Sequence, residues 1–187
     1  MNENITEEYQ LQLKQLHSSD VGWGNRIQIP KKIIDVIDQF NPVSILDYGC
    51  GKGHLTKSMQ GRWPEKIITG WDPSTHSWDQ MPNSVDFILS TDVLEHVEPA
   101  FIERTLFELS NRANHIMYHV IACYPAIAIL PDGRNAHLIV EKPDWWRDKF
   151  KKLANMEIIE EIIVDENQIR AVGEMHIVEY KVLLKKI

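Results

Sequence analysis

The segment SILDYGCGKGHLTK, residues 44–57, constrains the fold more than any other part of the sequence. It begins as a short aliphatic strand, passes an acid and three alternating glycines, and continues as a polar stretch compatible with a helix. In an α/β sheet with helices on both faces, a glycine turn after the first strand lets the polar part of a ligand approach the backbone. The segment therefore predicts a ligand site at the carboxyl end of a parallel sheet.

The spacing of the glycines excludes one common phosphate site and disfavours another. A P-loop requires Gly-Lys followed by Ser or Thr, whereas Lys52 is followed by Gly53. A dinucleotide fingerprint requires glycine at its sixth position, and counting from Gly49 this position is His54. An imidazole there would obstruct the close packing of helix against strand beneath a pyrophosphate.

Short hydrophobic runs alternate with helical periodicity along the rest of the chain. We expect four strands and four helices: strands at 43–46, 66–71, 85–90 and 116–123, and helices at 30–40, 55–62, 99–114 and from about 144. Two last strands, 156–164 and 175–184, are joined by only about ten residues, too few for a helical crossover, so they should pair antiparallel. The sequence thus predicts a mostly parallel α/β sheet that ends in an antiparallel hairpin.

Length and composition fit one soluble domain covering residues 1–187. The net charge of −7 disfavours a dedicated nucleic-acid binder, which usually carries a basic face. The first residues do not form a signal peptide, and no apolar run is long enough to span a bilayer. We therefore expect a cytoplasmic protein without a membrane partner; its oligomeric state cannot be inferred.

The pattern Asp47, Gly49, Gly51, Gly53 resembles the first motif of class I S-adenosylmethionine-dependent methyltransferases. Two further segments carry this resemblance: ITGWDPS, where Asp72 ends a strand, and VDFILSTDVLEHVEP, residues 85–99, which is similar to the superfamily's fourth strand and adjoining loop. The motifs cover roughly residues 43–125, and the order of elements covers the whole chain. The resemblance implies a Rossmann-like, doubly wound fold, S-adenosylmethionine as cofactor, and methyltransferase activity.

The resemblance also implies a set of cofactor-binding residues. Asp47 would face the amino group of the cofactor, and Asp72 would accept the ribose hydroxyls. A partly helical segment, residues 1–42, precedes the first strand and would cover the cofactor through Trp23 and Gly24. The full expected set is Trp23, Gly24, Asp47, Gly49, Cys50, Gly51, Gly53, Trp71, Asp72, Pro73, Thr91, Asp92 and Val93.

Residues 73–84 depart from the superfamily pattern. Common members place a helix, a third strand and another helix in this interval, which twelve residues cannot hold. We expect the third strand to be lost or replaced by one short extended piece, with the adenine against Trp71, Trp78 or Met81. This trimmed form resembles small methyltransferase-like proteins of bacteriophages and their hosts.

Candidate catalytic residues fall in two loops at the predicted active end of the sheet. Asp92 and His96 follow one strand, and His137 lies in the loop after the next. His137 is suited to act as a base or to orient the acceptor, whereas local hydrogen bonding would equally explain His96. We expect methylation of an oxygen or nitrogen of a small molecule or sugar. A protein that binds the cofactor without transferring its methyl group is the alternative from another class.

Asp92, Glu95, His96 and His137 also resemble the metal site of the small-RNA 3′-terminal 2′-O-methyltransferases. There, two acids and two imidazoles hold a divalent ion, and the residues present here suit such an ion chemically. However, Asp92 stands where that family has Glu, and the acidic chain lacks an evident RNA face. The sequence therefore favours a site without metal and without nucleic acid, and keeps a metal-dependent RNA 2′-O-methyltransferase as an alternative.

Overall fold

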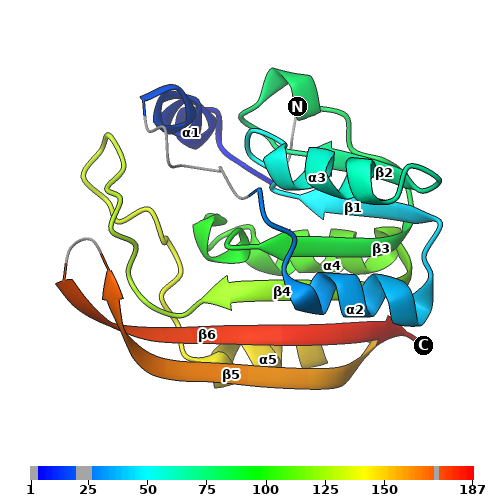
Figure 1. The fold of residues 1–187 in the computed structure, drawn as a ribbon. Helices are drawn as coiled ribbons and strands as arrows, with labels where there is room; N and C mark the ends of the chain where they lie inside the picture. Colours follow the sequence, from blue (N-terminus) through cyan, green and yellow to red (C-terminus); the bar gives the residue numbers. More distant parts are fainter. Residues whose placement is uncertain (1–3, 20–26, 171–172) are drawn as a thin grey trace.

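The structure is a computed structural model that describes residues 4–19, 27–170 and 173–187. Six strands form one sheet in the order β2-β1-β3-β4-β6-β5 (Figure 1). Their bounds are β1 Ser44–Tyr48, β2 Ile67–Trp71, β3 Val85–Thr91, β4 Ala113–Ala122, β5 Met156–Arg170 and β6 Gly173–Lys186. Strands β1 to β4 are parallel, whereas β6 runs antiparallel to both β4 and β5. The predicted Rossmann-like, mostly parallel sheet with an antiparallel hairpin is therefore confirmed.

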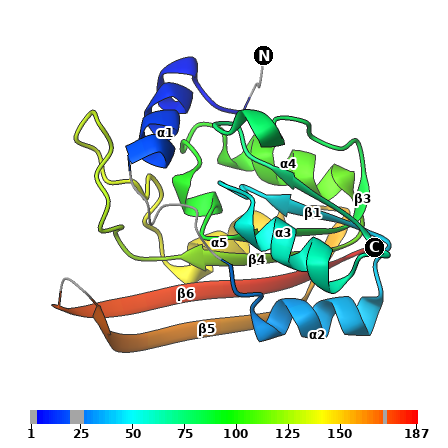
Figure 2. The same cartoon turned by 45° about the horizontal axis from the view of Figure 1, so that its top comes forward.

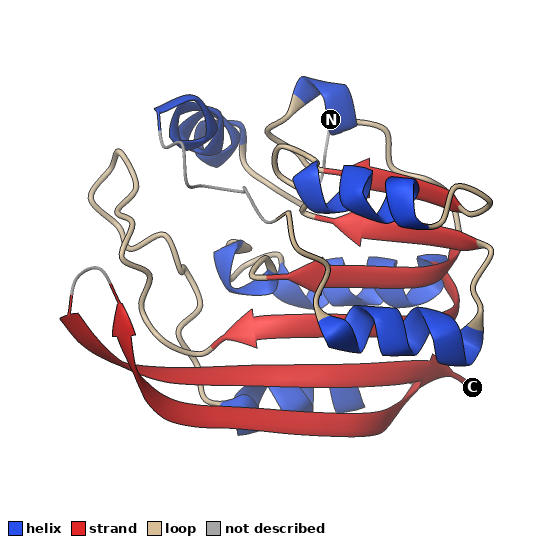
Figure 3. Cartoon of the chain, viewed as in Figure 1, coloured by secondary structure: helices blue, strands red, loops and turns tan. Residues whose placement is uncertain are grey.

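Helices cover both faces of this sheet. The helices are α1 Glu7–Ser19, α2 Lys31–Phe40, α3 His54–Arg62, α4 Ile102–Arg112 and α5 Pro143–Lys151, with 3₁₀ turns η1 His76–Trp78 and η2 Leu94–His96. Helices α2 and α3 lie on one face and α4 and α5 on the other, while α1 stands at the end where the parallel strands finish (Figures 2 and 3). Among the described residues, no helix has the length and apolar character needed to cross a membrane.

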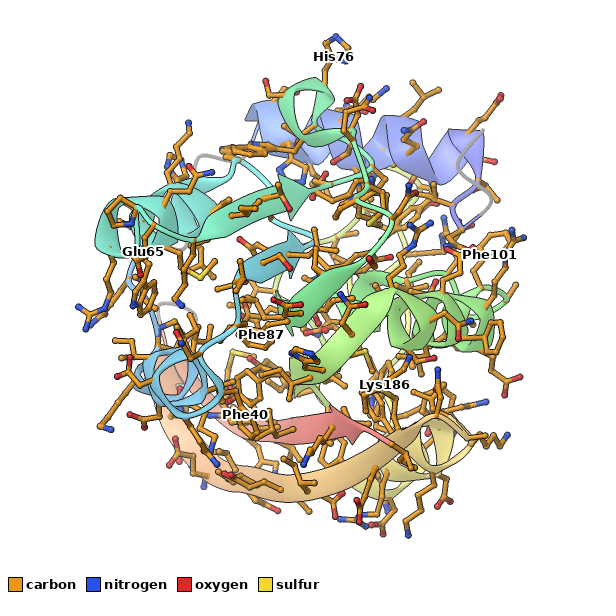
Figure 4. All side chains as sticks on the ribbon, turned by 90° about the vertical axis from the view of Figure 1, so that its right-hand side faces the viewer. Phe40, Glu65, His76, Phe87, Phe101 and Lys186 are labelled. Atoms are coloured by element: carbon orange, nitrogen blue, oxygen red, sulfur yellow. The ribbon has the colours of Figure 1, made fainter. Side chains whose placement is uncertain are left out.

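The core is divided by the sheet because successive side chains of a strand point to opposite faces. In β3, Phe87 and Leu89 pack with α2 and α3, whereas Ile88 packs with α4 and α5. Phe87 lies inside the molecule, and His76 projects from its margin (Figure 4). A strand buried on both faces reads as a continuous apolar run, which is why residues 85–90 could be recognised from sequence.

The third-strand region is trimmed, as expected. Residues 72–84 contain no strand, and the short turn η1 replaces the helix–strand–helix insertion. Strand β2 is consequently the edge strand next to β1.

Two elements differ from the expectation. The antiparallel hairpin does not have a ten-residue connection, since β5 and β6 pair from Met156 opposite Lys186 to Arg170 opposite Gly173. Its polar residues 165–168 looked like a loop, but a two-stranded ribbon that extends beyond the sheet can expose both faces to water. In addition, helix α1 was not predicted as a distinct element, because residues 7–19 are polar and the segment 1–42 was expected only to be partly helical.

Phe87→Ala tests this division of the core. Phe87 is fully buried in the β3 layer, so removing its ring should lower the free energy of unfolding by about 3–5 kcal/mol. Phe107→Ala on α4 is the matched control, since Phe107 is 59% exposed and its loss should change stability by no more than about 0.5 kcal/mol. Urea unfolding followed by circular dichroism measures both, and equal effects would contradict the assigned core.

Candidate active site

A cavity of about 890 Å³ opens at the carboxyl ends of the parallel strands, where an α/β sheet of this kind binds its ligand. It is lined by all but one of the described residues that the sequence assigned to the cofactor or to catalysis: Asp47, Gly49, Cys50, Gly51, Trp71, Asp72, Pro73, Thr91, Asp92, Val93, His96 and His137. The exception is Gly53. Trp23 and Gly24 lie outside the described residues.

The glycine loop after β1 adopts a backbone that favours glycine. Gly49, Gly51 and Gly53 have φ angles of 74°, 55° and 74°, in the left-handed region that L side chains rarely adopt. A Cβ on Gly49 would lie 2.3 Å from Cγ1 of Val93. A Cβ on Gly53 would lie 2.4 Å from the indole of Trp78. Gly49 thus lets the loops after β1 and β3 touch, while Gly53 accommodates Trp78 rather than lining the cavity.

Two buried carboxylates lie beside this loop. Asp47 Oδ2 accepts a hydrogen bond from Thr56 Oγ1 at 2.7 Å. Asp72 Oδ2 accepts from the backbone N–H of Gly51 at 3.0 Å, and its Oδ1 accepts from the N–H and hydroxyl of Ser74 at 2.9 and 2.6 Å. Oδ1 also accepts from the Thr75 hydroxyl at 3.4 Å, whereas Oδ2 accepts one hydrogen bond among the described residues. Because each carboxylate oxygen has about two acceptor positions, Oδ2 keeps one for a hydroxyl of a ligand.

Of the three side chains expected to contact an adenine, only Trp71 lines the cavity. Its ring stacks on Tyr48 with centroids 4.8 Å apart. Trp78 packs over Gly53, and Met81 packs against the core on the α4 face. Trp71 is therefore the best placed of the three to offer a flat surface to a base.

The opposite side of the cavity brings together the candidate catalytic residues. Asp92 directly follows β3 and has a φ of 57°, and the turn η2 then presents His96. The loop after β4 brings His137 to His96, with ring centroids 4.8 Å apart. Burial lowers the pKa of His96 to about 3, helped by the neighbouring His137, and burial also lowers the pKa of His137. Both imidazoles are therefore neutral at pH 7.

Helix α1, which belongs to the segment 1–42, forms a wall of the cavity, although the sequence did not identify it as a distinct element. Tyr9 donates its hydroxyl proton to the carbonyl of His96 at 2.7 Å, and Gln12 donates to Asp132 at 2.9 Å. Tyr9 packs with Leu130 and Ala136, so α1 is held against the loop between β4 and α5 (Figures 1 and 2). The available signal was the spacing of Ile5, Tyr9, Leu13 and Leu16, which places apolar residues on one helical face.

The lining suits a cationic ligand without phosphate. Among the described lining residues there is no lysine or arginine, whereas Asp47, Asp72 and Asp92 all contribute carboxyl groups. S-adenosylmethionine carries an ammonium, a sulfonium and two ribose hydroxyls, which match acids and a close backbone approach. The residues present therefore fit this cofactor: Asp47 and the glycine loop would hold its methionyl part and Asp72 its ribose.

Comparison with known proteins agrees with this fit. Residues 23–153 match the sequence model of a family described as "Methyltransferase domain". This chain belongs to that family. It is thereby a member of the class I S-adenosylmethionine-dependent methyltransferases, and its expected cofactor is confirmed at the level of the family.

Individual relatives are distant. Trans-aconitate 2-methyltransferase of Mycolicibacterium gilvum is 38% identical over 42 residues, which cover 22% of this chain and only 16% of that enzyme. The structure of Burkholderia thailandensis 1,6-didemethyltoxoflavin-N1-methyltransferase, with bound 1,6-didemethyltoxoflavin and S-adenosylhomocysteine, aligns at a TM-score of 0.61 and 14% identity, covering 96% of this chain and 89% of that one. Magnesium protoporphyrin IX methyltransferase of Synechocystis, with bound S-adenosylhomocysteine, aligns at 0.56 and 13%, covering 95% and 84%. At these identities the two structures show a shared fold.

Asp72→Ala should weaken S-adenosylmethionine binding about 10- to 100-fold, because ribose hydroxyls lose a charged acceptor worth about 1.5–3 kcal/mol. Asp79→Ala is the matched control, since Asp79 lies just after η1 and its side chain is exposed. Isothermal titration calorimetry measures both affinities. An Asp72→Ala affinity within about twofold of the wild type would show that the ribose lies elsewhere.

Gly49→Ala tests the contact between the two loops. Its Cβ would clash with Val93, so we expect weaker cofactor binding and lower stability. The double variant Gly49→Ala/Val93→Ala should recover part of both losses, leaving about 1–2 kcal/mol of backbone strain at the positive φ.

Gly61→Ala is the control for this experiment, because a Cβ on Gly61, in α3, would meet nothing within 4 Å. Calorimetry and urea unfolding measure binding and stability. If removal of the Val93 methyl groups gave no recovery, the clash would not be the cause.

Proposed function

We propose that the protein transfers a methyl group from S-adenosylmethionine to an oxygen or nitrogen of a small molecule that has an apolar body and no strong negative charge. One observation carries the proposal: the acid-lined glycine loop and the Asp92, His96 and His137 side chains line a single cavity. Its volume of about 890 Å³ is near the upper end of ordinary small-molecule sites, which run from about 300 to 1,000 Å³. It therefore has room for a cofactor and an acceptor together.

The acceptor side of the cavity is mostly apolar. Tyr124, Ala126, Ile127 and Ala128 line it from the loop after β4, and Ile177 lines it from β6. Such a lining favours a flat or aliphatic body over a polyol, whose hydroxyls would lose their hydrogen bonds to water. The toxoflavin precursor held by the Burkholderia relative is likewise a small molecule.

The charge of the lining argues against trans-aconitate itself as acceptor. That substrate, named for the Mycolicibacterium relative, is a tricarboxylate, and its charges would require cationic partners in a buried site. The described lining offers acids and no lysine or arginine. The match to that relative is confined to 42 residues and carries little information on the acceptor.

The cofactor supplies an electrophilic methyl group, so the chain must align the acceptor and exclude water. In the transfer, a lone pair of the acceptor atom forms the new bond to the methyl carbon while the carbon–sulfur pair returns to sulfur. The acceptor's proton passes to solvent. Asp92, His96 and His137 stand on the acceptor side of the cavity and would hold the acceptor atom in line.

The test begins with calorimetric titration of S-adenosylmethionine and S-adenosylhomocysteine. Transfer of a radiolabelled methyl group is then measured against a panel of neutral alcohols, phenols and amines, with trans-aconitate as the anionic comparison. We expect both S-adenosylmethionine and S-adenosylhomocysteine to bind. Transfer to neutral acceptors should exceed transfer to trans-aconitate. If neither cofactor bound at millimolar concentration the proposal would fail. Binding without transfer to any acceptor would instead identify a cofactor-binding protein.

With an acceptor in hand, His137→Ala should lower kcat about 100-fold, because a misplaced acceptor reacts far more slowly. The affinity for S-adenosylmethionine should stay within about twofold of the wild type. His76→Ala is the control, since the His76 side chain is 99% exposed. Equal kcat values in the two variants would show that His137 does not act at the acceptor site.

A further inference from the structure

Two side chains that line the cavity, His96 and His137, form a compact donor set with the buried Glu95. Glu95 and His96 are consecutive residues of the turn η2, and His137 comes from the loop after β4. Each offers one ligand atom, and the three atoms all lie within 4.8 Å of one another. Bonds of about 2.0–2.2 Å to one ion would place neighbouring ligand atoms roughly 3–3.5 Å apart, so the ligand atoms need to approach one another by at most roughly 1–2 Å.

The two imidazoles are oriented by the backbone. Nδ1 of His96 donates to the carbonyl of Ala136 at 2.7 Å, and Nδ1 of His137 donates to the carbonyl of Tyr124. In a neutral imidazole with its proton on Nδ1, the lone pair is on Nε2. A second hydrogen bond of this kind, from the ring nitrogen that does not hold the ion, accompanies nearly every metal-ligating histidine.

Glu95 supplies the independent observation. It has no exposed surface, and its Oε1 accepts from the backbone N–H of Ala122 at 2.9 Å. Its Oε2 is buried and has no hydrogen-bond partner among the residues that the structure describes. Leaving a buried oxygen without a partner lowers stability, and more so if the group is charged. Burial raises the pKa of Glu95 well above its usual range, and the neighbouring Asp92 raises it further.

Among the described residues, no lysine or arginine forms an ion pair with Glu95. A structural carboxyl group in such a place would normally be hydrogen-bonded through both oxygens or paired. An unpartnered buried oxygen beside two oriented imidazoles has instead the form of an incomplete coordination shell.

We propose that Glu95, His96 and His137 bind one divalent first-row transition-metal ion, with its remaining coordination positions toward the cavity. Two imidazole nitrogens and one carboxylate oxygen suit Zn²⁺, Co²⁺ or Mn²⁺, whereas Mg²⁺ prefers an all-oxygen shell. The sequence had favoured a site without metal. The burial of Glu95 and the two backbone-oriented rings, which no sequence pattern displays, are the grounds for the different assignment.

The ion also narrows the acceptor, and this part rests on the proposed function. His96 and His137 line the cavity, so a ligand at the open positions would face the site of transfer. A hydroxyl bound to a divalent ion loses its proton far more readily, as water does. The proton leaves to solvent, and the oxygen lone pair then attacks the methyl carbon as the carbon–sulfur pair returns to sulfur. The acceptor atom is accordingly an oxygen.

The test measures metal binding before any transfer. Chelator-treated protein is titrated with Co²⁺, whose visible absorption reports its coordination, and with Zn²⁺ by calorimetry. We expect one ion per chain, with Glu95→Gln, His96→Ala and His137→Ala each weakening binding at least about 100-fold, beyond the loss typical of an outer-shell partner. His115→Ala, at an exposed position of β4, is the matched control and should bind like the wild type.

Each variant's affinity for S-adenosylmethionine and its unfolding midpoint show whether it is folded. Glu95→Gln keeps the shape of the side chain, so it remains informative if a histidine variant unfolds. Absence of saturable Co²⁺ and Zn²⁺ binding, or equal binding by wild type and Glu95→Gln, overturns the metal site. Methyl transfer that persists in chelator would overturn the role of the metal in transfer and leave the proposed function intact. Metal binding without transfer to any acceptor would instead overturn the proposed function and leave the metal site intact.

Discussion

The carboxylate of Asp72 connects the two loops on which the site depends. It accepts from the N–H of Gly51 in the loop after β1 and from Ser74 in its own loop after β2. The backbone N–H groups of Gly49 and Cys50 both donate to the carbonyl of Trp71, directly before it. Neighbouring strands are thus joined at their carboxyl ends as well as along their length, so the glycine loop has a fixed conformation. A cavity with a defined shape follows from this local network of hydrogen bonds.

The same network explains how the fold tolerates the loss of its third strand. Strand β2 is left at the edge of the sheet. Its five residues pair with β1 on one side, and no strand of the described sheet pairs with them on the other side. The backbone N–H of Asp72 donates to the carbonyl of Trp78, and the Trp78 ring lies over Gly53. The short turn η1 therefore covers the end of the glycine loop. A short edge strand also limits pairing with other chains.

The parts that sequence could predict are those whose cause is local. Strands such as β3 are continuous apolar runs, and the glycines of the first loop are needed because side chains would meet Val93 and Trp78 or strain the backbone. Helix α1 escaped prediction because its polar composition gives a weak signal and its position depends on contacts with residues 126–138. The length of the β5–β6 hairpin escaped for a similar reason, since polar residues in an extended ribbon look like a loop. The buried carboxyl group of Glu95 is likewise a property of three-dimensional packing, since the N–H of Ala122, at the end of β4, donates to one of its oxygens.

Because of the β5–β6 hairpin, the two halves of the cavity come from different parts of the chain. The cofactor half comes mainly from residues 47–93, which are close in sequence and belong to adjacent parallel strands. The acceptor half includes Met175 and Ile177 of β6, far along the chain and carried past the sheet by the long ribbon. Residues 173–178 of β6 lie beyond the pairing with β4 and pair with β5, and such a two-stranded extension opens more readily than strands inside a sheet. On warming or in mild denaturant, the acceptor wall should therefore loosen while the cofactor loop still holds its shape. Substitutions at Met175 and Ile177 would then alter the proposed acceptor wall without touching the residues proposed to bind the methyl donor.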